Sequence, residues 1–213
     1  MKFAMSYSGG KDCNLAIHKM IQQGHTLVAL VTTVNSEQQR SWFHGIPESL
    51  LQASAASLGV PLITAESTPD NYTEALVEAL IRARELGAEA CAFGDIDIDQ
   101  HKEYDDDVAK QAGLISVLPL WKMDRDQVIN EQMSSGIKAV IKLVDKSQLD
   151  ESFLGQTVTL ELVEKIKAAG ADACGENGEY HTFVYDGPCF AEPVAYQTGE
   201  LVDFGTHMAI DIF

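Results

Sequence analysis

A glycine-containing turn near the N-terminus constrains the fold of this chain more than any other segment. The apolar run at residues 3–7 predicts a buried strand, and the pattern after the turn predicts a helix that stops at Gly24. A strand that turns through two glycines into a helix N-terminus forms an anion site, because the backbone can approach a phosphate closely and unpaired helix N–H groups point at it. The residues expected to surround the phosphates are Ser8, Gly9, Gly10, Lys11 and Asp12.

Lys11 and Asp12 are the charged members of this turn. Lys11 supplies a mobile cation, and Asp12 is expected either to cap the helix or to hold a metal ion. The G-x-x-x-x-G-K-[ST] spacing of the Walker turn is absent, so the turn is not built for transfer of a γ-phosphate. A plain tight turn is the alternative, and the order Ser-Gly-Gly-Lys-Asp after a first strand argues against it.

Strand and helix patterns alternate through the first 120 residues. Repeated β-α-β units of this length predict an α/β fold, a parallel five-stranded sheet with helices on both faces, of the Rossmann-like kind. Ligands of such sheets bind beyond the carboxyl ends of the strands. Thr33 lies near the end of the second strand, and Gly94 and Asp95 follow another strand, so these residues are expected to meet the first turn in one crevice. An adenine nucleotide bound there would place its base near Val31 to Thr33. The further strands are expected at 27–34, 60–65, 90–93 and 115–118, and the helices at 47–58, 72–86 and 100–112.

The pattern changes after Trp121. Turn signals and alternating strands become frequent after Gly175, and residues 201–213 predict part of an antiparallel ribbon. We therefore expect a phosphate-binding domain at residues 1–123 and a smaller C-terminal α+β lobe at residues 124–213 that binds the second substrate.

Charge and cysteine usage limit the partners. The net charge is −17, from 32 acidic and 15 basic residues, which opposes binding to nucleic-acid phosphates. None of the 4 cysteines forms a C-x-x-C pair, so reduced thiols in a cytoplasmic protein are expected. No apolar stretch approaches the ~18 residues of a membrane-spanning helix, so no membrane association is expected. A homodimer is left open.

Two further clusters carry potential chemistry. Glu176 and Glu179 lie between glycines and could bind Mg²⁺ or orient an amine nucleophile, with His181 as a proton carrier. The alternative is a polar turn with solvated glutamates. Asp95 suits a ribose or metal contact, whereas the neighbouring aspartates are expected on a solvated face; these are Asp97, Asp99 and Asp105 to Asp107.

Four motifs in order along the chain resemble the diphthine–ammonia ligase family, which belongs to the PP-loop ATP pyrophosphatases of adenine-nucleotide α-hydrolase type. They are Ser8 to Asp12, Gly94-Asp95-Ile96, Pro119-Leu120-Trp121, and Gly175 to Tyr180 with Asp186-Gly187-Pro188. The resemblance implies that ATP is split into AMP and pyrophosphate while ammonia and a carboxylate form an amide. ATP and Mg²⁺ are the implied cofactors, with Asp12 and Glu176 as metal ligands. The catalytic residues would be Lys11, Asp12, Glu176, Glu179 and His181.

The chain departs from the family pattern at three positions. Asn177 replaces a glycine, His181 stands where the family has a glutamate, and Cys13 replaces a serine. Since two of these lie in the lobe expected to meet the acyl substrate, a carboxylate other than diphthine stays open. A PP-loop tRNA-modifying enzyme and a non-catalytic adenine-nucleotide sensor are the alternative functions. The acidic balance opposes the first, and the combination of Lys11 and Asp12 with the two glutamates opposes the second.

Overall fold

The computed structural model describes residues 1–213, and its first part is a mainly parallel sheet. Five parallel strands follow the order β4-β2-β1-β5-β6, and the short β3 pairs antiparallel with the end of β2. This arrangement confirms the predicted fold class and adds the antiparallel β3. The strands are β1 (Lys2–Ser6), β2 (Thr26–Asn35), β3 (Arg40–Ser41), β4 (Leu62–Ser67), β5 (Ala90–Ala92) and β6 (Ile115–Val117).

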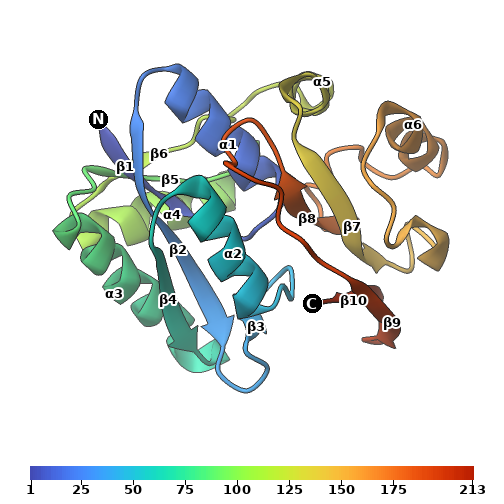
Figure 1. The fold of residues 1–213 in the computed structure, drawn as a ribbon, viewed down its shortest axis with the longest axis horizontal. Coiled ribbons are helices and arrows are strands. Elements are labelled where there is room, and N and C mark those ends of the chain that lie inside the picture. The colour runs from blue at the N-terminus through green and yellow to red at the C-terminus, as the bar shows by residue number, and fades with distance from the viewer.

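Helices cover both faces of this sheet, as Figure 1 shows. Side chains alternate between the faces along a strand, so Phe3 and Met5 of β1 pack with α1 and α2, whereas Ala4 packs with α3 and α4. Each predicted helix matches an observed one, and the ends differ by at most two residues. The observed helices are α1 (Lys11–Gln22), α2 (Glu48–Leu58), α3 (Tyr72–Glu85) and α4 (Asp99–Ala112), with a 3-10 turn η1 at Pro69–Asn71.

The second part is an antiparallel sheet with strand order β8-β7-β10-β9. The final ribbon expected at 201–213 is formed by β9 and β10. The strands are β7 (Lys138–Asp145), β8 (Tyr180–Asp186), β9 (Thr198–Asp203) and β10 (His207–Ile212), and the helices are α5 (Arg125–Ser135), α6 (Leu160–Ala168) and the 3-10 turn η2 (Glu151–Phe153).

One apolar core runs through both parts of the molecule. Leu15 and Ile17 of α1 belong to the same buried cluster as Val140 of β7 and Phe183 of β8. Figure 1 accordingly shows β8, the edge strand of the second sheet, next to α1. Helix α1 therefore supports both sheets, and the division of the chain at residue 123 stays a prediction.

Strand β8 also holds the first turn from the other side. The Val184 N–H donates to the Gly9 carbonyl at 2.8 Å, and the Lys11 N–H donates to Thr182 Oγ1 at 3.0 Å. The second sheet is thus fastened directly to the segment that the sequence marks as an anion site.

None of the helices combines the length and the apolar character that crossing a membrane would require. All four cysteines are free thiols.

Candidate active site

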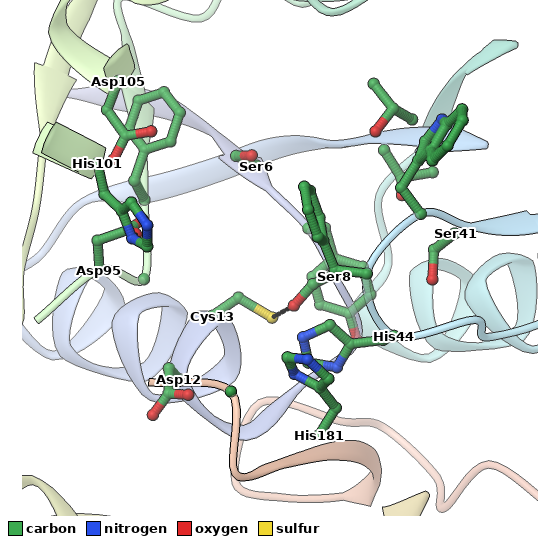
Figure 2. Close-up of a pocket in the computed structure, with 18 of the residues that line it drawn as sticks. Ser6, Ser8, Asp12, Cys13, Ser41, His44, Asp95, His101, Asp105 and His181 are labelled. Carbon is green, nitrogen blue, oxygen red and sulfur yellow. Dashed lines mark hydrogen bonds and ion pairs between the residues drawn. The ribbon is translucent and has the colours of Figure 1, made fainter. Parts of the chain in front are cut away.

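A cavity of about 790 Å³ opens at the carboxyl ends of the parallel strands, between the two parts of the molecule. Its walls come from the first turn, the end of β2, the segment after β3, the loop after β5 and the segment that leads into β8. Figure 2 shows these side chains converging from distant parts of the sequence. Most of the predicted site residues line it, namely Ser8, Lys11, Asp12, Thr33, Gly94, Asp95, Glu176 and His181.

The first turn has the backbone geometry that its glycines predicted. Gly9 has a φ of +82°, and a Cβ there would lie 2.6 Å from Ile46 Cδ1, so a larger residue is excluded on both grounds. The Gly10 N–H donates to Ser8 Oγ at 3.2 Å. The N–H groups of Asp12 and Cys13, in the first turn of α1, have no acceptor in the protein. These two donors are available to an anion in the cavity.

Lys11 is buried and bridges the two parts of the molecule. Its Nζ donates to Asp12 Oδ2 at 2.8 Å and to the carbonyl of Cys174, and it lies 5.3 Å from the centre of the Tyr180 ring. Burial alone would lower the pKa of Lys11, but the adjacent Asp12 carboxylate outweighs it and raises the pKa, so the ammonium stays charged.

The Asp12 side chain forms no helix cap. No side-chain hydrogen bond caps α1, and the Asp12 carboxylate instead accepts from Lys11 and from Gln132 Nε2, the latter at 2.8 Å. Of the two roles that the sequence left open, helix capping is therefore excluded in this structure. The carboxylate keeps further lone pairs on the cavity side.

Gly94 allows the loop after β5 to lie against α1. A Cβ at Gly94 would come within 2.9 Å of the Cys13 amide nitrogen and 3.1 Å of the Asp12 carbonyl carbon, which are backbone atoms and cannot move aside. Asp95 follows directly, and its Oδ1 lies 2.9 Å from His101 Nδ1. Asp95, His101 and Glu176 bring ligand atoms within 4.8 Å of one another.

The two glutamates before β8 occupy different environments. Glu176 lines the cavity and accepts from the Ile96 N–H at 3.1 Å, so it links the second part to the loop after β5. Burial raises the pKa of Glu176 to about 7. Glu179 is 6% exposed and does not line the cavity, because its two oxygens accept from the backbone N–H and the Nδ2 of Asn177, each at 3.0 Å. Glu176 therefore lies at the site, whereas the Glu179 side chain hydrogen-bonds within its own loop.

His44 is a cavity residue that the sequence analysis missed. Its ring lies against that of His181, with 4.5 Å between centroids and 45° between the ring planes, and its Nδ1 donates to the Thr182 carbonyl at 2.9 Å (Figure 2). Burial lowers the pKa of His44 to about 4. Burial, followed by the nearby His44, lowers the pKa of His181 as well, so both rings are neutral at pH 7. No local pattern predicts His44, because its partner lies on β8.

Asp105 corrects the expectation of a fully solvated acidic face. It lies on α4, is 6% exposed and lines the cavity, and its Oδ2 has no hydrogen-bond partner. Burial, together with the neighbouring Asp95 carboxylate, raises the pKa of Asp105. Asp97 also differs from the expectation, because both of its oxygens accept from Arg125, at 2.7 and 2.8 Å.

The fold and the cavity define an α/β protein in which a glycine-containing turn, of the kind that binds phosphates, lies between a parallel and an antiparallel sheet. The family model of the diphthamide synthase N-terminal domain matches residues 1–116, and that of the diphthamide synthase C-terminal domain matches residues 124–211. The chain belongs to this family.

Named relatives agree with the family models. The diphthine–ammonia ligases of Mus musculus and Homo sapiens are each 30% identical to the chain over 95% of its length and 85% of theirs. That of Saccharomyces cerevisiae is 26% identical over 89% of the chain and 33% of its own length. A solved structure, described as a predicted subunit of tRNA methyltransferase from Methanocaldococcus jannaschii DSM, is 13% identical with a TM-score of 0.45, and the match covers 88% of this chain and 98% of that one.

The two family models and the named ligases confirm the family predicted from the four motifs. They also confirm the predicted class of enzyme, an ATP-dependent amide-forming ligase.

Proposed function

We propose that this ligase cleaves ATP between the α- and β-phosphates and joins ammonia to a carboxylate. In the first step a carboxylate oxygen of the substrate attacks the α-phosphorus, and pyrophosphate leaves. In the second step ammonia attacks the acyl carbon, AMP leaves, and the nitrogen gives up a proton. The observation that carries the proposal is the first turn of α1, where two unpaired N–H groups and the charged Lys11 border one cavity.

The lining of the cavity favours one direction for the nucleotide. The β- and γ-phosphates would lie on Ser8 to Asp12, where backbone donors and the positive end of the α1 dipole favour negative charge. The adenine would lie against the end of β2, beside Thr33, and the ribose beside Gly94 and Asp95. This direction places the α-phosphate toward the loop that carries Glu176.

The donor set of the cavity fits Mg²⁺. Asp12 and Glu176 both line the cavity and come from different parts of the molecule, and carboxylate oxygens are the protein ligands that Mg²⁺ prefers. Each has lone pairs left after the hydrogen bonds to Lys11, Gln132 and Ile96. A bound Mg²⁺ would supply charge neutralisation for the phosphates, and Asp12 and Glu176 would hold it.

Neutral imidazole is available for the proton that ammonia releases. His181 lines the cavity, and its lowered pKa leaves a ring nitrogen free to accept a proton at pH 7. Glu179 would position the Glu176 loop through its bonds to Asn177 rather than touch the reacting atoms. This assignment differs from the catalytic role that the sequence suggested for Glu179.

The acyl substrate would enter beside His44 and His181, at the segment where the chain departs from its family pattern. A diphthine-type carboxylate is the first candidate because of the names of the relatives. Another carboxylate is the alternative, since Asn177 and His181 lie in this wall. A cytoplasmic location, a homodimer and the absence of nucleic-acid binding stay predictions.

Exchange of labelled pyrophosphate into ATP tests the route of cleavage. With the acyl substrate and no ammonia, the enzyme should incorporate labelled pyrophosphate into ATP, because adenylylation is reversible. With ammonia, AMP and pyrophosphate should accumulate in equal amounts. ADP and orthophosphate as the main products would overturn the proposal. The Lys11→Ala variant should lose both signals, and the Lys19→Ala variant, changed on the same helix, should keep them.

A further inference from the structure

We infer that Asp95, His101 and Glu176 form a binding site for a divalent transition-metal ion that does not require ATP. The three side chains come from the loop after β5, the first turn of α4 and the segment before β8. Their ligand atoms all lie within 4.8 Å of one another. Figure 2 shows Asp95 and His101 side by side on the wall of the cavity, with Asp105 next to them.

The separation of the ligand atoms suits a metal ion after a small closure. The centre of a triangle with sides of that length lies about 2.8 Å from each corner, whereas metal–ligand bonds to nitrogen and oxygen measure about 2.0–2.2 Å. Each side chain would therefore move inward by at most about 0.6–0.8 Å. Asp95 and His101 have side chains 28% and 51% exposed, so rotation of these groups meets little resistance.

Asp105 provides an independent indication of a cation. It follows His101 by one helical turn, which places the two residues on the same face of α4. Its carboxyl lies against that of Asp95, and its Oδ2 is buried without a partner. Native proteins rarely leave a buried carboxyl oxygen unsatisfied, so Asp105 Oδ2 lacks a partner that a cation bound at this pair of carboxyl groups would supply.

The basic side chains nearby are engaged elsewhere. Lys102 bonds to Asp106, and Lys122 bonds to Asp99. Arg125 bonds to Asp97 and Asp172. No lysine or arginine forms an ion pair with Asp95, Asp105 or Glu176, which leaves these acidic groups to a bound ion.

The imidazole determines which ions fit. Carboxylates alone suit Mg²⁺ and Ca²⁺, whereas imidazole together with carboxylates favours ions such as Mn²⁺, Fe²⁺, Co²⁺ and Zn²⁺. The cavity side of the cluster is open, so water or an anionic ligand can complete the coordination. Such an ion would fasten the Glu176 loop to α4 and present an exchangeable ligand in the cavity.

Titration of the metal-free chain with Co²⁺, without nucleotide, tests this site. Stoichiometric binding should produce visible d–d absorption bands. His101→Ala should remove the bands or lower the affinity at least tenfold. Asp105→Asn should lower it about 10–100-fold, as loss of a carboxylate behind the ligands does. His25→Ala and Asp99→Asn, which change exposed groups outside the cluster, should leave the titration unchanged.

The controls separate loss of the site from loss of the fold. Far-UV circular dichroism and thermal unfolding of each variant should match the unaltered chain. No stoichiometric Co²⁺ binding, or the same spectrum after His101→Ala, would overturn the inference. Co²⁺ binding in a chain that yields ADP instead of AMP would support the metal site and contradict the proposed cleavage of ATP. Pyrophosphate exchange without Co²⁺ binding would support the proposed cleavage of ATP and contradict the metal site.

Discussion

The N–H of Lys11 donates a hydrogen bond to Thr182 Oγ1 at 3.0 Å, although the two residues are 171 positions apart. Lys11 begins α1 on the first sheet, and Thr182 lies within β8 of the second. The start of the phosphate-type turn is therefore fixed by a side chain from the other sheet. The geometry of the candidate site therefore depends on both parts of the molecule.

Replacing Thr182 by valine should weaken this junction. Valine has nearly the same shape but no acceptor, so the Lys11 N–H would be left unsatisfied in a buried position. We expect a loss of about 1–3 kcal/mol in the free energy of unfolding, measured by urea denaturation. Thr26→Val, at an exposed position with no side-chain hydrogen bond, is the control and should change it by less than about 0.5 kcal/mol. Equal stabilities for the two variants would contradict the role given to Thr182.

Removing the Lys11 ammonium should weaken nucleotide binding. The group is charged and lies in the cavity wall, where a charge-assisted hydrogen bond contributes roughly 1.5–3 kcal/mol. Calorimetry of Lys11→Ala should show ATP affinity about 10–150-fold lower. Lys19→Ala removes an ammonium that pairs with Glu131 and should leave the affinity unchanged. Unaltered binding in Lys11→Ala would exclude Lys11 from the phosphate site.

Local patterns predicted the elements that have a clear apolar period. The helix expected at 72–86 is Tyr72–Glu85, and the strand expected at 27–34 is Thr26–Asn35. Helix α4 was located, but its orientation was not predicted, because a run of polar residues gives no sign that Asp105 points inward. Predicting that this carboxylate points inward requires knowing which loop covers it.

The site was predictable only in part, for the same reason. The turn at Ser8 to Asp12 carries its own signal, since two glycines and a helix start are local features. The contact between His44 and His181 depends on β8 lying against α1, which no spacing along the chain reveals. Glu176 and Glu179 look equivalent in sequence, and only the hydrogen bonds from Asn177 distinguish them.

Replacing Gly94 by alanine should disturb the turn at Ser8 to Asp12, although Gly94 lies far from that turn in the sequence. The added methyl group would collide with backbone atoms of Asp12 and Cys13, which cannot relax by a change of rotamer. We expect a loss of roughly 1–3 kcal/mol in the free energy of unfolding and weaker ATP binding. Gly187→Ala is the matched control, because its methyl group would meet ordinary contacts at 3.4 Å or more. Similar losses in both variants would argue against the close approach at Gly94.

Lys142 should make stability depend on pH in the alkaline range. Burial and the charge of Arg40 lower the pKa of Lys142 to about 8 from an ordinary value of 10.5. The unfolded chain then binds more protons between these values, so the free energy of unfolding should rise as pH increases from about 8 toward 10.5. A pKa difference of this size corresponds to about 3 kcal/mol.

The Lys142→Met variant isolates this contribution. Methionine fills a similar volume without the charge, so the variant should be more stable than the unaltered chain at pH 7, and the advantage should disappear by about pH 10.5. Urea denaturation at several pH values measures both curves, and titration of other groups cancels in their difference. An advantage that stays constant with pH would show that Lys142 has an ordinary pKa.

Glutamine variants of the two glutamates before β8 should differ: one should affect the rate of the reaction, and the other the stability of the loop. Glu176 lines the cavity and is proposed to hold Mg²⁺, so Glu176→Gln should lower the rate of amide formation about 10²–10⁴-fold while thermal unfolding stays unchanged. In Glu179→Gln the new NH₂ group is a donor and would face a donor of Asn177, so one hydrogen bond is lost. This loss should lower the melting temperature. Its effect on the rate should stay below about tenfold, since Glu179 itself does not line the cavity. A Glu179→Gln variant of unchanged stability that loses activity by 10²-fold or more would restore the catalytic role that the sequence suggested.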